Sequence, residues 1–67
     1  MTIFYNNNPE NLPCDSMTVE DLATLKNIPQ QGTAIAINDK LIKRDQWSVT
    51  PLKDLDRVTI ITAAFGG

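Results

Sequence analysis

The sequence contains no histidine and only one cysteine, Cys14, among its 67 residues. The missing imidazole excludes Ser–His and Cys–His nucleophile pairs, histidine proton shuttles and histidine metal ligands together. A single cysteine cannot form a disulfide within the chain, and it has no second cysteine for a zinc or redox motif. We therefore expect a structural thiol, no bound metal and a reducing, cytoplasmic compartment.

The chain also lacks a basic excess and any long apolar run. Its eight acidic and six basic residues give a net charge of −2, whereas nucleic-acid-binding proteins normally carry a strong basic excess. No apolar stretch approaches the roughly 20 residues of a membrane span, and the start of the chain has no signal-peptide pattern. We expect neither a nucleic-acid partner nor a membrane partner.

What the chain does contain is the composition of a small folded domain. Hydrophobic residues make up 42% of it and charged residues 21%, which argues against disorder. We expect one domain over residues 1–67. Because a chain of about 60 residues buries only about 60% of its unfolded surface, its core leaves no room for a deep catalytic cleft. Size alone favours a binding or carrier module over an enzyme.

The clearest local signal predicts a helix over residues 18–26. Thr18 is a good N-cap, and Asp21 stands at the capping-box position with aspartate in place of glutamate. Met17 and Leu22 occupy the two positions of a hydrophobic staple. A short helix is stable only when its apolar stripe packs on something else, and the stripe here consists of Val19, Leu22, Ala23 and Leu25.

Residues 2–5, 33–37 and 57–62 are rich in β-branched and aromatic residues, which is typical of strands. A short strand around residues 10–13 would close a hairpin with the first, and residues 41–43 form another short strand. The predicted order is β-β-α-β-β-β, an α+β architecture with one helix packed on a mixed sheet. Pro13 would confine the second strand to an edge. In residues 33–37 isoleucines share one face and alanines the other, and the sequence leaves open which face is buried. Trp47, in an irregular turn, is expected over the edge of the core.

Alternation along the first and last strands, which we expect to be adjacent and parallel, sorts their side chains between two faces. The set expected to face the helix is Ile3, Tyr5, Val58 and Ile60. This turns Phe4 and Ile61 to the other face of the sheet. An exposed aromatic residue and an isoleucine near the end of the chain form a candidate partner-binding patch. Coverage by loops or by a dimer contact is the alternative.

The chain ends in Phe65-Gly66-Gly67, and the carboxylate of Gly67 is the one group whose position invites chemistry. Two glycines can thread a slot too narrow for residues with a Cβ atom. The five residues after Thr62 span roughly 16–18 Å when extended. That is far enough to enter the active site of another protein. An ordinary frayed terminus is the alternative.

With these elements in place, the chain resembles the ubiquitin-like β-grasp proteins and, more narrowly, the ThiS sulfur carrier family. The resemblance covers essentially the whole chain, including the opening strand and the start of the helix. Its most specific part runs from Ala36-Ile37-Asn38 to Arg44 and Trp47, which is similar to the family pattern A-[IV]-N-x-x-[LIV]-[IV]-P-R-x-x-W. Lys43 stands where the family usually has proline, and Phe65 is bulkier than the small residue often found before Gly-Gly.

The resemblance implies a sulfur carrier of thiamine (thiazole) biosynthesis that is not itself an enzyme and binds no cofactor. An adenylating, E1-like activating enzyme would use ATP to adenylate the Gly67 carboxylate. A cysteine desulfurase-linked donor would then supply sulfur for a thiocarboxylate, and thiazole synthase would receive that sulfur. Gly66 and Phe65 would belong to a flexible tail, residues 63–67, that gives the partners access. Arg44 joins Phe4 and Ile61 as a candidate partner contact.

Two alternatives stay open. A molybdopterin-synthase small subunit shares the fold, the tail and the sulfur chemistry, and a β-grasp protein-interaction module would share the fold with an inert tail. ATP-dependent adenylation of Gly67 separates both carriers from the interaction module. Addition of thiazole synthase then separates the two carriers.

Overall fold

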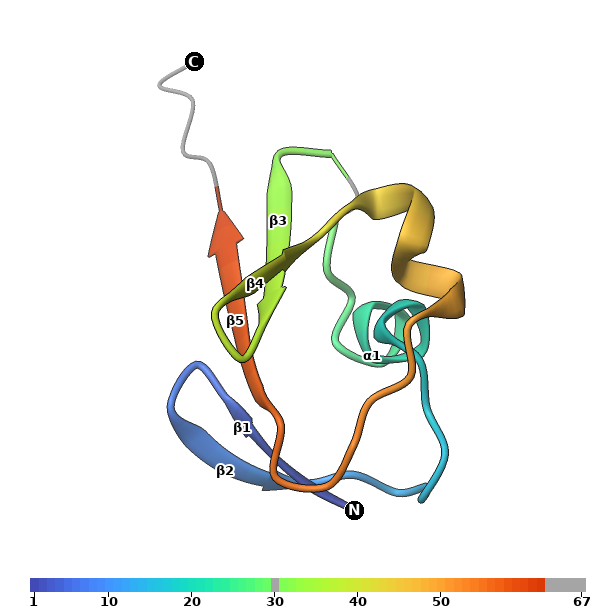
Figure 1. The fold of residues 1–67 in the computed structure, drawn as a ribbon, viewed down its shortest axis with the longest axis vertical. Helices are drawn as coiled ribbons and strands as arrows, with labels where there is room; N and C mark the ends of the chain where they lie inside the picture. Colours follow the sequence, from blue (N-terminus) through green and yellow to red (C-terminus); the bar gives the residue numbers. More distant parts are fainter. Residues whose placement is uncertain (30, 63–67) are drawn as a thin grey trace.

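The computed structural model describes residues 1–29 and 31–62, which form one mixed sheet with a helix packed against one face (Figure 1). The elements are β1 (Thr2–Tyr5), β2 (Asn8–Asn11), α1 (Val19–Leu25), β3 (Thr33–Ile37), β4 (Lys40–Ile42), the 3₁₀ helix η1 (Arg44–Val49) and β5 (Arg57–Thr62). The strand order is β2-β1-β5-β3-β4. The predicted α+β order is confirmed, and β1 and β5 are adjacent and parallel, as expected. The predicted tail, residues 63–67, lies outside the described residues.

Two tight asparagine turns fix the register of the hairpins. Asn6 and Asn7 have φ of 49° and 71°, and Asn38 and Asp39 have φ of 50° and 70°. Positive φ at both central residues is the geometry of a two-residue hairpin turn, which asparagine and aspartate tolerate better than most residues. The partners across the turns are Tyr5 with Asn8 and Ile37 with Lys40.

These short turns correct the predicted bounds of two strands. β2 begins at Asn8 rather than near residue 10, and β4 begins at Lys40 rather than at residue 41. β2 is an edge strand as predicted, but the proline within it is Pro9, while Pro13 lies beyond its end. An edge position accommodates Pro9 because a proline has no N–H for a second neighbour.

Helix α1 begins with the predicted capping box. The Asp21 N–H donates to Thr18 Oγ1 at 3.2 Å, and the Thr18 N–H donates to Asp21 Oδ2 at 3.0 Å. The two residues of the expected staple, Met17 and Leu22, are both buried in the core. At the other end of the helix, Lys26 pairs with the Glu10 carboxylate, and its Nζ lies 5.0 Å from the centroid of the Tyr5 ring. The helix is thereby tied to the β1–β2 hairpin.

The prediction that Leu25 belongs to the buried stripe of the helix is wrong. Leu25 is 47% exposed, whereas Val19 and Leu22 are completely buried. Leu25 comes six residues after Val19, so at about 100° per residue it lies about 120° away from Val19 around the helix axis. Lys26, one full heptad after Val19, is the residue in line with the stripe. Its apolar stem and charged head suit that half-buried position.

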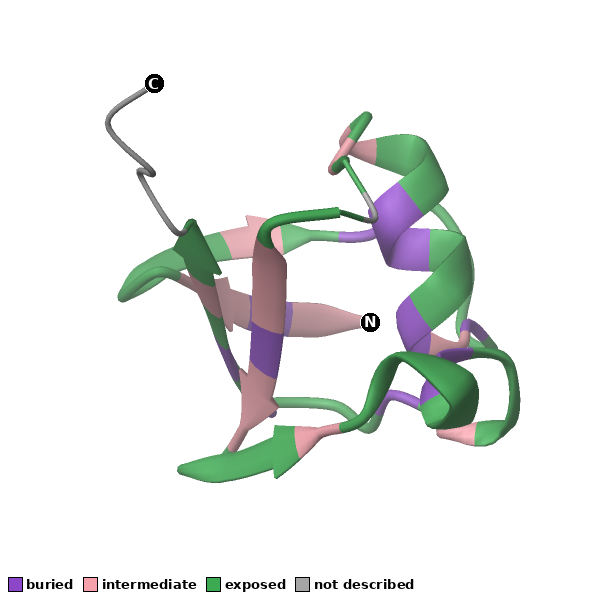
Figure 2. Ribbon diagram, turned by 90° about the horizontal axis from the view of Figure 1, so that it is seen from above, coloured by how far each residue is buried: buried purple, intermediate pink, exposed green. Residues whose placement is uncertain are grey.

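The core lies between α1, η1 and the inner face of the sheet (Figure 2). Its members are Ile3, Leu12, Met17, Val19, Leu22, Ala23, Ile35, Trp47, Leu52 and Val58, with Tyr5 and Ile60 partly buried against them. The expected inward set on β1 and β5 is therefore confirmed.

The structure decides two points about the core that the sequence left open or placed differently. On β3 the isoleucines face inward, since Ile35 is fully buried and Ile37 packs against the core. Trp47 is only 2% exposed and lies inside the core rather than over its edge. The segment expected to be an irregular turn is the 3₁₀ helix η1, which directs the indole inward, where Nε1 donates to the Ile42 carbonyl at 3.2 Å.

Candidate functional site

The start of β5, the strand that leads to the C-terminal residues, is held from two sides. From the β3 side, the Asn38 N–H donates to the Arg57 carbonyl at 2.8 Å, and Asn38 Oδ1 accepts from the Arg57 N–H at 2.9 Å. From the β1 side, the Phe4 N–H donates to the Asp56 carbonyl at 2.9 Å. The base of β5 is therefore fixed within the sheet.

Asp56 also stabilises the start of β5. It is the one buried charged residue among those that the structure describes. Its Oδ1 accepts from Asn38 Nδ2 at 3.0 Å, and its Oδ2 accepts from the Lys53 N–H at 2.8 Å. A buried carboxylate is costly unless its oxygens are hydrogen-bonded. Both oxygens here have partners, so Asp56 is a structural residue that joins the β3–β4 turn to the start of β5.

The far end of β5 has a more open environment. β5 is paired with β3 from Val58, which is opposite Ile37, to Thr62, which is opposite Thr33. β1 is paired with β5 only at its first two residues, so the strand extends past the β1–β2 hairpin (Figure 1). The end of β5 lies on the opposite side of the molecule from the N terminus.

The outer face of the sheet, away from α1, presents apolar side chains close to this open end. The residues share the face because Ile61 is opposite Ala34, and Ala36 is opposite both Thr59 and Leu41. Ile61 and Leu41 are 49% and 61% exposed, and the two alanines are partly exposed. We call this group the outer apolar face and define it as Ala34, Ala36, Leu41 and Ile61.

Phe4 and Ile61 both lie on the outer side of the sheet, but the structure does not bring them together as one patch. Phe4 is opposite Arg57 on β5 and opposite Pro9 on β2. Ile61 comes four positions after Arg57 along the strand, a distance of about 13 Å at about 3.3 Å per residue. Ile61 is instead opposite Ala34 on β3, and Leu41 lies in the next row of the same face, opposite Ala36.

Leu41 is the outer-face residue that the sequence reasoning missed. The signal that could have found it is the alternation within β4, because Ile42 packs against the core and its neighbour must then point outward. The exposed Arg44 lies just beyond β4, at the start of η1. With Lys40 and Lys43, also exposed, it places three positive charges along the β4 edge next to the outer apolar face.

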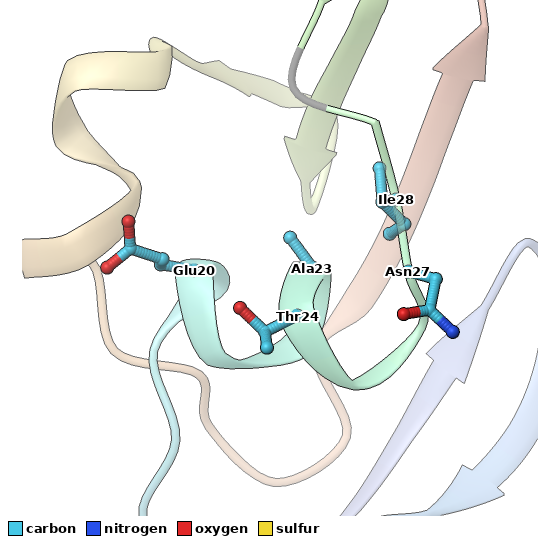
Figure 3. A pocket seen from close by; sticks show the side chains of 5 residues that line it. All are labelled: Glu20, Ala23, Thr24, Asn27 and Ile28. Atoms are coloured by element: carbon cyan, nitrogen blue, oxygen red, sulfur yellow. The ribbon is translucent and has the colours of Figure 1, made fainter.

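The described residues offer no cluster of metal-ligating side chains. A shallow depression of about 320 Å³ on α1 is lined by Glu20, Ala23, Thr24, Asn27 and Ile28 (Figure 3). It contains a single ionisable side chain. Within residues 1–29 and 31–62, no three cysteine, aspartate or glutamate side chains gather as metal ligands. Cys14 is exposed rather than packed as a structural thiol. The same residues contain no helix long and apolar enough to cross a membrane.

A small mixed sheet with parallel central strands and one helix across its inner face is the β-grasp architecture. Residues 3–67 match the model of the ThiS family, so the chain belongs to the ThiS family. Members of this family are sulfur carriers in thiamine biosynthesis; they are not catalysts and carry no bound cofactor.

Solved structures share the fold over the full chain. A crystal structure of the thiamine biosynthesis protein ThiS from Geobacter metallireducens superposes with a TM-score of 0.87 at 23% identity, covering 100% of both chains. An NMR solution structure of a thiamine biosynthesis protein from the same organism gives 0.84 at 22% identity, covering 100% of this chain and 88% of the other. At these identities the likeness concerns the fold alone. No curated protein matches the sequence significantly.

Proposed function

We propose that the chain carries sulfur on the carboxylate of Gly67 for the formation of the thiazole ring of thiamine. The observation that carries the proposal is the family match, which extends through the terminal Gly66-Gly67 pair. In the proposed cycle, an activating enzyme adenylates Gly67 with ATP. Sulfur from a cysteine desulfurase-linked donor then gives a thiocarboxylate, and thiazole synthase takes that sulfur.

Each step has a chemical reason. A carboxylate is a poor electrophile, so its oxygen first attacks the α-phosphate of ATP and releases pyrophosphate. The resulting acyl-adenylate is attacked by a sulfur nucleophile, and AMP leaves with the C–O bond electrons. With a persulfide donor the product is an acyl disulfide. A thiolate then attacks the donor's sulfur of that S–S bond and forms a disulfide with the donor. The thiocarboxylate leaves with the electrons of the broken bond, and it is a good nucleophile at neutral pH. ATP is a substrate of the partner and not a cofactor of this chain.

The tail and the folded body have separate roles in this proposal. Phe65, Gly66 and Gly67 enter the partner's active site, where two residues without Cβ atoms fit a narrow channel. The five residues after Thr62 span roughly 16–18 Å. The body docks through the outer apolar face, with Phe4 and Arg44 as further contacts. The exposure of Ile61 near the end of β5, and of Leu41 on the same face of the sheet, supports this arrangement.

We propose that the carrier and its three partners work in the cytoplasm. An exposed, unpaired Cys14 is compatible with a reducing compartment. The interaction-module alternative has no use for the Gly-Gly end, which lies within the family match.

ATP–pyrophosphate exchange by the activating enzyme tests the proposal. Addition of one alanine after Gly67 removes the free acid from the required position, and deletion of Gly67 shortens the arm by about 3.5 Å. Because a misplacement of about 1 Å can already cost about 100-fold in rate, both variants should abolish exchange while they fold normally. Exchange at the wild-type rate by the alanine-extended protein would overturn the proposal.

A second measurement separates the thiamine carrier from a molybdopterin-synthase small subunit. The thiocarboxylated protein is incubated with the thiazole synthase of the same cell, and the intact mass of the carrier is followed. We expect a return from the thiocarboxylate mass to the carboxylate mass as sulfur is delivered. Retention of sulfur with thiazole synthase, together with its loss to a molybdopterin-synthase large subunit, would favour the alternative.

A further inference from the structure

We propose that Asn6 is a positioning residue for the C-terminal tail, because its side chain accepts the last hydrogen bond between β5 and the β1 side in the described part of the chain. Asn6 follows directly after β1, and its N–H donates to the Val58 carbonyl at 2.9 Å. Its Oδ1 accepts from the Ile60 N–H at 2.8 Å. The proposal rests on the proposed function, since it concerns how the tail is presented for adenylation.

The hydrogen-bond pattern explains why a side chain is needed here. In a parallel ladder, the residue that donates to Val58 also accepts, through its backbone carbonyl, from Ile60. Asn6 cannot do so, because its φ of 49° belongs to the turn that leads into β2. Its carbonyl instead accepts from Asn8 Nδ2 at 3.4 Å. The side-chain amide oxygen of Asn6 therefore takes the place of its own backbone carbonyl and extends the ladder by one bond.

Few residues can perform this substitution. The position needs a residue that tolerates the left-handed region, and it needs an acceptor oxygen on a short side chain. Asparagine and aspartate meet both requirements. Asn7, the next residue of the turn, has φ of 71°, but its side chain makes no hydrogen bond with the part of the chain that the structure describes. The two asparagines therefore share a turn and a backbone conformation but differ in their contact with β5.

The position of this bond gives it a functional consequence. Ile60 stands two residues before Thr62, where β5 ends. Beyond Ile60, the described part of β5 is paired only with β3, through Ala34 and Thr33. Loss of the Asn6 bond leaves the last residues of β5 with support on one side. The direction in which β5 leads toward Gly67 is then fixed less tightly, which we expect to slow the reaction of the carboxylate.

Three variants separate positioning from folding. Asn6→Gly retains access to positive φ and removes the acceptor oxygen, whereas Asn6→Asp retains both. Asn7→Gly is the matched control, because it introduces the same flexibility in the same turn without touching β5. Hydrogen exchange by NMR then reports the protection of the Ile60 amide against that of core amides such as Ile35 and Val58.

We expect about tenfold faster exchange of the Ile60 amide in Asn6→Gly, with core amides unchanged, and wild-type behaviour in Asn6→Asp and Asn7→Gly. In ATP–pyrophosphate exchange, kcat for Asn6→Gly should fall about three- to tenfold while KM for the carrier stays within twofold. A purely structural role would instead lower the exchange protection of all amides together.

The outcomes distinguish this inference from the function on which it rests. Absence of exchange activity with the wild-type carrier overturns the proposed function, and the positioning role falls with it. Activity with the wild type and equal kcat values for Asn6→Gly and Asn7→Gly overturn the positioning role alone. An unchanged Ile60 amide in Asn6→Gly also overturns it, because the bond would then not hold the strand.

Discussion

The two faces of the sheet are built from the same strands but differ in what their side chains contact. On the inner face, Ile3, Ile35 and Val58 are at most 1% exposed and pack under α1 with Trp47. On the outer face, Ala34 and Ala36 leave room between the exposed side chains of Ile61 and Leu41. Large branched residues on one face stabilise the fold, whereas small residues beside isolated large ones leave a surface for a partner. Substitutions on the two faces should therefore affect different measurements.

The largest expected effect is on the inner side, at Leu22. Truncation of this completely buried side chain in Leu22→Ala should cost about 2–5 kcal/mol of unfolding free energy. A domain of this size has a total stability of roughly 3–10 kcal/mol, so the variant will be partly or fully unfolded. Urea denaturation followed by circular dichroism measures the loss. A cost below 1 kcal/mol would mean that the helix does not contribute its apolar face to the core as described.

The next largest effect is on partner binding through the outer apolar face. We expect the double substitution Ile61→Ala and Leu41→Ala to weaken binding of the activating enzyme about 10- to 100-fold, or about 1.4–2.7 kcal/mol. Unfolding free energy should change by less than about 0.5 kcal/mol per exposed site. Calorimetric titration of the carrier into the enzyme gives the affinity.

The chain offers a matched control for that double variant. Leu25 and Val49 are 47% and 66% exposed, close to the 49% and 61% of Ile61 and Leu41, but they lie on α1 and η1. The double substitution Leu25→Ala and Val49→Ala removes a similar amount of exposed apolar surface away from the outer face. Equal losses of affinity in the two double variants would contradict docking through the outer apolar face.

A smaller effect is expected at the cap of α1. Thr18→Ala removes the acceptor of the Asp21 N–H and should cost about 1 kcal/mol of stability. Affinity for the activating enzyme should remain unchanged, because the cap lies on the side of the molecule opposite the outer face. Thr18→Ser restores the acceptor, so a full loss of stability in the serine variant would show that the hydroxyl is not the cause.

The smallest expected effect concerns the corrected member of the helical stripe. Because Leu25 is 47% exposed, Leu25→Ala should change the free energy of unfolding by no more than about 0.5 kcal/mol. Alanine also has a slightly better helix propensity than leucine. Thermal or urea denaturation beside Leu22→Ala makes the comparison direct. Similar losses of unfolding free energy in Leu22→Ala and Leu25→Ala would show that Leu25 is packed in the core.

Local sequence signals predicted the helix, the strands and the inward-facing side chains of β1 and β5, and the reasons are physical. Thr18 and Asp21 mark the start of a helix through bonds only three residues apart. Alternation on β1 and β5 placed Ile3 and Val58 inward, because successive side chains of a strand point to opposite faces. The family resemblance followed from short motifs and from the Gly66-Gly67 end, which the family match also covers. Bounds of β2 and β4 were less accurate, because turn length sets them.

The sequence by itself determined the element order, the capping box, the membership of the ThiS family and the residue proposed to carry sulfur, because all of these are properties of neighbouring residues. Tertiary structure alone decided which face of β3 is buried, since that depends on which side α1 covers. It also placed Trp47 inside the core, Leu41 beside Ala36 and the Asn6 side chain against Ile60. These contacts join residues from separate elements, as far as 54 positions apart for Asn6 and Ile60, and no local period encodes such a pairing.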